Sequence, residues 1–222
     1  MSFVIKEFST GYDRKQIIHS LNLVLNNNEW LGIIGANGSG KSTFLKGIGR
    51  ILKPFSGTAI IGDKNIHDWP TKDIAKEISF LPQIQNNNLQ LTVYEFVCLG
   101  RSPYKEWWNW NLNNYDNSIV LKSLKATELC NLKDTLICNL SGGQRQRAYL
   151  SLALAQEPQT LLLDEPTTFL DINYQIKFLN LLKILKNEKS LSIITVIHDI
   201  NLALRFCDRI AILKNGKILA LD

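Results

Sequence analysis

The feature that most constrains this chain is a glycine-rich octamer, GANGSGKS, at residues 35–42. It follows a short apolar run, Trp30 to Ile34, that reads as a strand, and it precedes a helical stretch, Thr43 to Leu52. Glycines let the backbone curl so that successive amides point at phosphate oxygens, and the helix that follows adds its positive N-terminal end. A flexible turn is the alternative for the bare pattern, but the strand and the helix around it favour a phosphate-binding loop.

Two side chains of this loop are predicted to carry charge and metal. Lys41 would neutralise the β- and γ-phosphates of ATP, and the Ser42 hydroxyl would hold Mg2+. The loop backbone and its neighbours would supply the other contacts. The predicted phosphate-binding set is Gly35, Asn37, Gly38, Ser39, Gly40, Lys41, Ser42 and Thr43.

Short apolar runs alternate with helical patterns along the chain. Besides Trp30 to Ile34, strands are predicted at Ile78 to Leu81, Thr160 to Leu163 and Ser192 to Ile197. The alternation predicts an α/β fold with a mainly parallel sheet between helices. Residues 88–156 interrupt it and are predicted to form a second, helical lobe, inserted into a core made of residues 1–87 and 157–222.

The C-terminal third of the chain should contain a covering helix and a hairpin. Asn215-Gly216 is typical of a tight turn between two strands. Apolar residues three or four positions apart predict one amphipathic helix, and they are Ile172, Ile176, Leu179, Leu182 and Leu185.

Polar side chains stand where three of the predicted strands end. Parallel sheets bind ligands at that edge, so Asp164 suits a contact to Mg2+, and Glu165 could polarise the attacking water as general base. His198 could sense a γ-phosphate, and Gln83 could ligate Mg2+ or orient water. Each has a purely structural alternative: a turn pair at 164–165, a packing histidine and a glutamine that ends a strand. Asp199 is a plausible N-cap for the helix that follows His198.

A second octamer, LSGGQRQR at residues 140–147, has the chemistry of another anion site. Ser141 would cap the helix that follows, Gly142 and Gly143 permit close approach, and the helix N-terminus attracts negative charge. The alternative is an ordinary capped helix with a solvated arginine face.

Taken in this order, the motifs resemble those of the ATP-binding cassette (ABC) family over almost the entire chain. The resemblance implies a P-loop NTPase core, an N-terminal antiparallel β part and an inserted α-helical subdomain. It makes residues 35–43 the Walker A loop and residues 140–144 the signature. The other residues it assigns are Gln83 of the Q-loop, Asp164 and Glu165 of Walker B, Asp171 of the D-loop, the switch histidine His198, and Tyr12, which would stack on adenine unless it is a turn residue.

The resemblance also implies a quaternary arrangement. Two cassettes pair head to tail when ATP binds, so that each ATP lies between one Walker A loop and Ser141, Gly142, Gly143 and Gln144 of the other copy. A lone monomer would be nearly inactive. The runs LGRSPY at residues 99–104 and HDINLA at residues 198–203 look like those of ATPases that serve ferric siderophore, haem and cobalamin importers. Such an ATPase acts on integral membrane permease subunits and, through them, a substrate-binding protein.

An aromatic tract in the predicted second lobe could lie near that membrane partner. Its tryptophans are Trp107, Trp108 and Trp110, and packing within the lobe is an equally good interpretation.

The bulk properties fit a soluble, cytosolic protein at the inner face of the membrane. The net charge of +5 is spread along the chain, and no apolar run reaches the length of a membrane span. The cysteines Cys98, Cys130, Cys138 and Cys207 are far apart in sequence and are predicted to be reduced packing residues. A cassette ATPase acting on nucleic acid or ribosomes, a transporter ATPase for another cargo and an unrelated P-loop kinase are the alternatives. The absence of sustained heptads disfavours the first, and the octamer at 140–147 disfavours the kinase.

Overall fold

The computed structural model describes residues 2–83, 89–106, 108, 111–168 and 170–222. Its central sheet has the strand order β10-β9-β3-β8-β7-β6. Neighbouring strands from β9 to β6 are parallel, and β10 is antiparallel to β9. The bounds are β3 (Trp30–Ile34), β6 (Ile78–Leu81), β7 (Thr160–Asp164), β8 (Ser192–Val196), β9 (Arg209–Lys214) and β10 (Lys217–Leu221).

The mainly parallel sheet predicted from sequence is therefore confirmed, and so is the turn at Asn215-Gly216. Every residue of β3, β7 and β8 is buried, because helices or another sheet cover both faces. That burial explains why these strands read as continuous apolar runs. Strand β7 extends one residue further than predicted, to Asp164, and β8 ends at Val196, one residue earlier.

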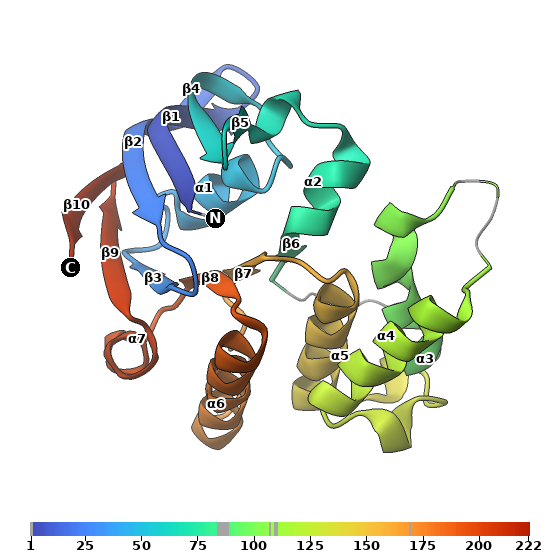
Figure 1. Ribbon diagram of the computed structural model, residues 1–222. Coiled ribbons are helices and arrows are strands. Elements are labelled where there is room, and N and C mark those ends of the chain that lie inside the picture. Colours follow the sequence, from blue (N-terminus) through green and yellow to red (C-terminus); the bar gives the residue numbers. More distant parts are fainter. Residues whose placement is uncertain (1, 84–88, 107, 109–110, 169) are drawn as a thin grey trace.

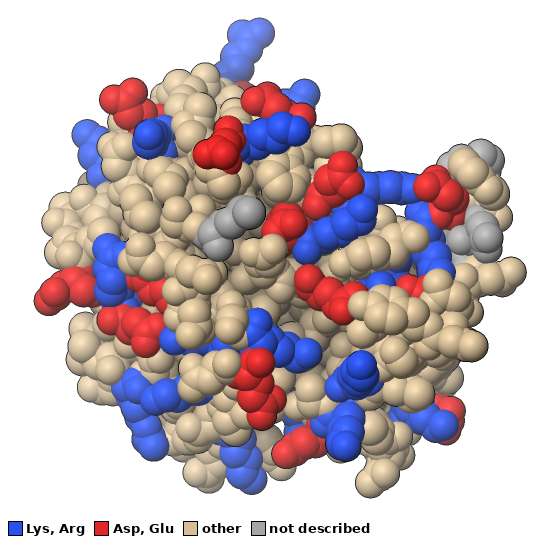
Figure 2. Space-filling view, in the orientation of Figure 1, with Lys and Arg blue, Asp and Glu red and all other residues tan. Residues whose placement is uncertain are grey.

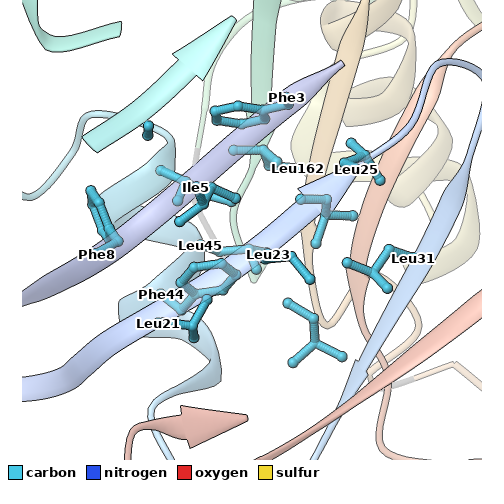
Figure 3. Packing of buried hydrophobic residues seen from close by; sticks show 14 of the residues in the cluster. Phe3, Ile5, Phe8, Leu21, Leu23, Leu25, Leu31, Phe44, Leu45 and Leu162 are labelled. Atoms are coloured by element: carbon cyan, nitrogen blue, oxygen red, sulfur yellow. The ribbon is translucent and has the colours of Figure 1, made fainter. Parts of the chain in front are cut away.

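A second, antiparallel sheet covers one face of the central sheet (Figure 1). Helix α1 (Lys41–Ile48) lies between the two sheets, where Phe44 and Leu45 pack among side chains of β1, β2 and the central sheet (Figure 3). Sequence predicted that this helix would run to Leu52, but it ends at Gly49, its C-cap. In the order β2-β1-β4-β5, the second sheet contains β2 (Lys15–Leu25), β1 (Phe3–Tyr12), β4 (Pro54–Ile61) and β5 (Lys64–Asn65).

Helices α6 (Ile172–Lys189) and α7 (Ile200–Phe206) contribute to the core on the opposite face of the central sheet. Trp30 of β3 is buried there, and its Nε1 donates to Thr195 Oγ1 at 3.0 Å. Most of the predicted apolar stripe of α6 faces this core, with Leu179, Leu182 and Leu185 fully buried and Ile176 partly buried. The prediction is wrong for Ile172, which is 53% exposed because it is the first residue of the helix.

The segment after β6 is mainly helical and packs around a core of its own. Helices α3, α4 and α5 surround this core (Figure 1), and each begins with a capping box that satisfies its first amides. The cap residues are Thr92, Asn113 and Ser141. The helices not yet given bounds are η1 (Ile66–Asp68), α2 (Thr71–Glu77), α3 (Val93–Cys98), η2 (Leu99–Tyr104), α4 (Asn114–Ala126), η3 (Cys130–Leu132), η4 (Ile137–Asn139) and α5 (Gly142–Ala155).

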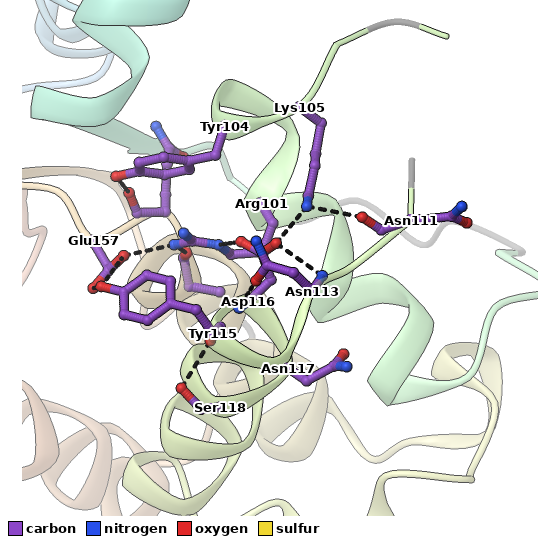
Figure 4. A network of polar contacts seen from close by, with 12 residues as sticks. Arg101, Tyr104, Lys105, Asn111, Asn113, Tyr115, Asp116, Asn117, Ser118 and Glu157 are labelled. Carbon is purple, nitrogen blue, oxygen red and sulfur yellow. Dashed lines mark hydrogen bonds and ion pairs between the residues drawn. The ribbon is translucent and has the colours of Figure 1, made fainter. Parts of the chain in front are cut away.

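A buried ionic network lies where these helices rejoin the core (Figure 4). Arg101 is 1% exposed; its Nε donates to Asp116 Oδ1 at 3.0 Å, and its Nη1 donates to Ala155 O and Glu157 Oε2, each at 2.7 Å. Burial alone would raise the pKa of Asp116, but hydrogen bonds from Lys105 and Arg101 bring it below its usual value. The network therefore holds a paired carboxylate inside the protein.

The cysteines are free thiols in different environments. Cys98, Cys138 and Cys207 are partly buried, and burial raises the pKa of Cys207 to about 12. Cys130 is exposed, so the prediction that all four are packing residues is wrong there. None of the helices in the described part of the chain is long and apolar enough to cross a membrane.

Candidate functional site

The glycine-rich loop connects β3 to α1 and adopts backbone angles that only glycine takes easily. Gly38 and Gly40 have φ of 78° and 103°. At Gly35, a Cβ would lie 2.2 Å from Leu213 O, so a side chain is excluded by close packing. Gly40 is the N-cap of α1 and supplies no side-chain cap, so the first amides of the helix remain available to an anion.

Lys41 and Ser39 give the loop the polar groups that a polyphosphate needs. Lys41 Nζ donates to Gly35 O at 2.9 Å and to Ala36 O at 3.1 Å, so the ammonium lies over the loop. Ser39 is 5% exposed, and its Oγ has no hydrogen-bond partner among the described residues. A buried hydroxyl without a partner is uncommon, and a phosphate oxygen would satisfy it. The residues present therefore fit ATP.

A hydroxyl and a carboxylate meet at the start of α1. Ser42 Oγ donates to Asp164 Oδ1 at 2.8 Å, which joins the loop to the end of β7. Burial raises the pKa of Asp164, and the hydrogen bond from Ser42 opposes that rise. An anionic oxygen with little solvent around it, next to a hydroxyl, is a donor set that suits Mg2+.

Glu165 is the centre of a second cluster at the same edge of the sheet. Its Oε2 accepts from Gln83 Nε2 at 2.9 Å and from Thr168 Oγ1 at 3.2 Å, and its Oε1 lies 2.6 Å from His198 Nε2. Its φ of 52° directs the chain sharply out of β7. The structure thus brings together Gln83, Glu165 and His198, which the sequence predicted as separate strand-end residues. Together with the loop they line a cavity of about 440 Å³, whose walls are Ile17, Asn37, Gly38, Gly40, Lys41, Ser42, Thr43, Gln83, Glu165 and His198.

Two residues of the site were missed by sequence reasoning. Ile17 comes from β2 of the antiparallel sheet, and nothing in its local pattern shows that the sheet folds over the loop. Thr168 follows Glu165 by three residues and also donates its amide to the Glu165 carbonyl at 3.2 Å, as in a turn. The turn was readable from the sequence, whereas the side-chain contact to the carboxylate was not.

The predicted residues of the 140–144 motif lie elsewhere. Ser141 caps α5, as predicted, by accepting from Gln144 N at 3.3 Å, and Gln144 Oε1 accepts from Ser141 N at 3.0 Å. Gly143 instead lines a separate cavity, beside Tyr174 of α6, and among the described residues no member of the motif lines the cavity at Lys41. The N-termini of α1 and α5 therefore lie at different cavities of one chain.

Tyr12 and Asp171 are also outside that lining. Tyr12 ends β1, is exposed, and its hydroxyl lies 3.4 Å from Lys46 Nζ of α1. Asp171 caps α6 by accepting from the amides of Asn173 and Tyr174, each at 3.1 Å. Asp199 caps α7 in the same way, which confirms that prediction.

Comparison with known proteins agrees with this geometry. A model of the family described as ABC transporter matches residues 18–168. A probable siderophore transport system ATP-binding protein of Bacillus subtilis is 42% identical over 190 residues, covering 86% of this chain and 69% of the relative. The ferric enterobactin transport ATP-binding protein of Escherichia coli is 37% identical over 193 residues, covering 87% of this chain and 71% of the relative.

Solved structures give the same result. A dimeric structure of a bacterial ABC transporter cassette is 32% identical and has a TM-score of 0.83, covering 99% of this chain and 97% of the other. The family match spans most of the sequence, and the fold agrees with it. The chain therefore belongs to the ABC transporter family, as an ATPase cassette.

Proposed function

We propose that this ATPase energises the import of an iron chelate through separate membrane subunits, and that it works as a homodimer. The observation that carries the proposal is that the N-termini of α1, at Lys41, and of α5, at Ser141, lie at different cavities of one chain. Two copies arranged head to tail would place the second end against the phosphates bound by the first. The siderophore transport proteins of Bacillus subtilis and Escherichia coli, named above, support the cargo class.

The roles of the loop residues follow from their positions. The Lys41 ammonium, which now contacts the carbonyls of Gly35 and Ala36, would bind β- and γ-phosphate oxygens in their place. Its positive charge would then offset the negative charge that develops on the leaving group. Ser42, Asp164 and Gln83 would hold Mg2+, which would supply positive charge to offset the charge of the phosphates. The amides of residues 41–43 and the Ser39 hydroxyl, which has no partner among the described residues, would bind the remaining oxygens.

Glu165 is positioned to accept a proton from the attacking water. Gln83 and Thr168 share one of its oxygens and His198 contacts the other, so the carboxylate is oriented by three side chains. His198 Nε2 lies within hydrogen-bond distance of Glu165 Oε1, and an N–H at this atom could instead donate to a γ-phosphate oxygen in the cavity.

The remaining residues complete the site across the dimer. Ser141, Gly142, Gly143 and Gln144 of one copy would cover the γ-phosphate held by the other, with Asp171 beside the interface. Tyr12 would stack on adenine, since it is exposed at the end of β1 beside α1. The dimeric cassette structure supports this assembly.

The membrane partner is proposed to contact the helical lobe, which we propose comprises residues 88–156. Residue 88 lies outside the described part of the chain. Among the described residues of this lobe, five large apolar side chains are exposed and offer a surface for a permease subunit: Leu99, Tyr104, Trp108, Tyr115 and Leu121. Trp107 and Trp110 lie outside the described residues. Such a subunit would hold the ATPase at the cytoplasmic face of the membrane and link it to a substrate-binding protein.

Binding to nucleic acid is the less favoured function. Basic and acidic side chains are interspersed over the face drawn in Figure 2, whereas a surface that binds a phosphate backbone concentrates positive charge. Copurification with membrane subunits encoded nearby tests the transport function, and recovery with ribosomes or DNA instead would contradict it.

Replacing the base tests the dimer. Glu165→Gln keeps the hydrogen-bonding geometry but cannot accept a proton, so it should accumulate an ATP-bound dimer, measured by light scattering with saturating ATP and Mg2+. The double variant Glu165→Gln, Ser141→Arg should bind ATP and remain monomeric, because the arginine blocks the helix end. Glu188→Gln, in an exposed part of α6, is the matched control. Monomers of the Glu165→Gln protein under saturating ATP would refute the composite site.

A further inference from the structure

The turn of the C-terminal hairpin rests directly on the phosphate loop. Gly216, between β9 and β10, donates its backbone N–H to Ser39 O at 2.9 Å, and its own carbonyl accepts from His19 N of β2 at 2.9 Å. Gly216 is buried, although the residues on either side of it are exposed. It therefore links the loop to the antiparallel sheet through two backbone hydrogen bonds.

Only glycine fits this position. Its φ is 71°, and a Cβ would lie 1.8 Å from Ile17 O and 2.8 Å from His19 Cδ2. An Asn-Gly turn is typical of any tight hairpin, so the sequence accounts for the positive φ alone. The collision with Ile17 is a separate constraint, which comes from the packing of the turn against β2.

The hairpin also touches the other end of the loop. The carbonyl of Leu213, the penultimate residue of β9, would lie 2.2 Å from a Cβ at Gly35. Strand β9 is already paired with β3 up to the residue before the loop, where Ile212 lies opposite Ile34. The loop is thus held at its start by β9 and near its end by the turn.

The hydrogen bond to Ser39 O fixes the direction of one amide of the loop. In a planar trans peptide the C=O of one residue and the N–H of the next point in opposite directions. Because the Ser39 carbonyl points at Gly216, the N–H of Gly40 must point away from the hairpin. Gly40 also lines the nucleotide cavity, so we infer that this amide is directed toward the phosphate-binding space.

We propose that Gly216 is a positioning residue for nucleotide binding, acting through Ser39 although it does not line the nucleotide cavity. The hairpin preorganises the loop, so that binding ATP does not require ordering the Ser39-Gly40 peptide. This inference rests on the proposed nucleotide site. It assigns part of the affinity for ATP to a hairpin turn that lies outside the phosphate-binding loop.

The chain offers a direct way to remove this one hydrogen bond. Cys207 precedes β9, so a synthetic peptide spanning residues 207–222 can be joined to the rest of the chain by ligation at that cysteine. Replacing Gly216 by glycolic acid changes the Asn215–Gly216 amide into an ester and deletes the N–H, with no new side chain. Replacing Asp222 by malic acid is the matched control, because it deletes a hairpin hydrogen bond to Ile210 O of 3.1 Å, at the end of β10 away from the turn.

The affinity for a fluorescent ATP analogue and the midpoint of thermal unfolding are then measured for the ligated parent and both esters. The ester at 216 should weaken binding about fivefold, the factor that one net hydrogen bond contributes, while the ester at 222 stays within about twofold of the parent. Both esters should lower the unfolding midpoint similarly. Equal affinity of the two esters would overturn the inference. A parent that does not bind the analogue would instead refute the proposed nucleotide site.

A mutational comparison provides a second, independent test. Gly62 in the turn between β4 and β5 has a φ of 61°, so Gly62→Ala shares the positive-φ strain of Gly216→Ala, whose new Cβ also collides with Ile17 O. Only the second displaces a residue bonded to the loop. Gly216→Ala should lose the larger share of ATP affinity at matched stability, and equal losses would contradict the positioning role.

Discussion

Replacing Arg101 by methionine should lower the free energy of unfolding by about 3 kcal/mol. Breaking a buried ion pair costs about 3–5 kcal/mol when one charge is left behind. The lower end applies because Lys105 still pairs with Asp116, whose side chain is 3% exposed, while Glu157 is 35% exposed and can be rehydrated. The Ala155 carbonyl also loses its donor, which is worth about 1 kcal/mol. Methionine keeps the apolar stem of the arginine, so lost packing adds little.

Urea unfolding followed by circular dichroism gives the measurement. Arg205→Met, in an exposed position of α7, is the control and should change stability by no more than about 0.5 kcal/mol. Glu157→Gln should lie between the two, because its carboxylate is partly solvated. If Arg101→Met were destabilised by less than about 1 kcal/mol, the network could not be the ionic anchor that its burial and hydrogen bonds imply.

Three further changes test individual groups. Burial raises the pKa of Asp164, so its charged form destabilises the fold above that pKa. Asp164→Asn should therefore raise the melting temperature at pH 7 without nucleotide, yet weaken Mg2+-dependent ATP binding. A lower melting temperature of the variant would contradict this reasoning. Burial, and to a smaller extent the charge of Arg50, lowers the pKa of His67 in the folded protein. The unfolded chain therefore binds more protons at this residue than the folded one, and the free energy of unfolding should fall as the pH drops through about 6.5. His67→Gln should flatten this part of the plot of stability against pH. Thr195→Val leaves the buried Trp30 Nε1 without its acceptor and should cost about 1–3 kcal/mol in urea unfolding, with a change below about 0.5 kcal/mol refuting the hydrogen bond.

The strands could be located from the sequence because the central ones are buried on both faces. Strands β3, β7 and β8 are mostly apolar, and such runs can be recognised in the sequence without knowledge of the neighbouring strands. Helix limits were less accurate. Helix α1 stops at Gly49, a residue that favours a C-cap, while Ile172 satisfies the helical period yet is exposed, since periodicity cannot tell where a helix leaves its sheet.

The polar residues of the site were predictable for a related reason. Asp164, Glu165 and His198 follow recognisable strands, and parallel strands end at one edge. Their hydrogen bonds were not predictable, because the contact between Gln83 and Glu165 depends on the pairing of β6 with β7. Ile17 lines the cavity beside the loop and Gly216 donates a hydrogen bond to it, although both are far from the loop in sequence. Such long-range contacts cannot be predicted from local sequence patterns.

The hydrogen bonds of Lys41 to Gly35 and Ala36 set a threshold for what the loop accepts. These carbonyls occupy two of the three N–H groups of the ammonium, so an anion that takes all three must displace both carbonyls. A halide is a single acceptor atom, and a single phosphate holds its four oxygens around one phosphorus, so neither extends along the loop as a triphosphate does. A triphosphate can offer oxygens to the Lys41 ammonium and to the amides of α1 at the same time, so both groups contribute to its binding. The lysine thereby makes the loop selective for chain length among phosphates before any base or sugar is recognised.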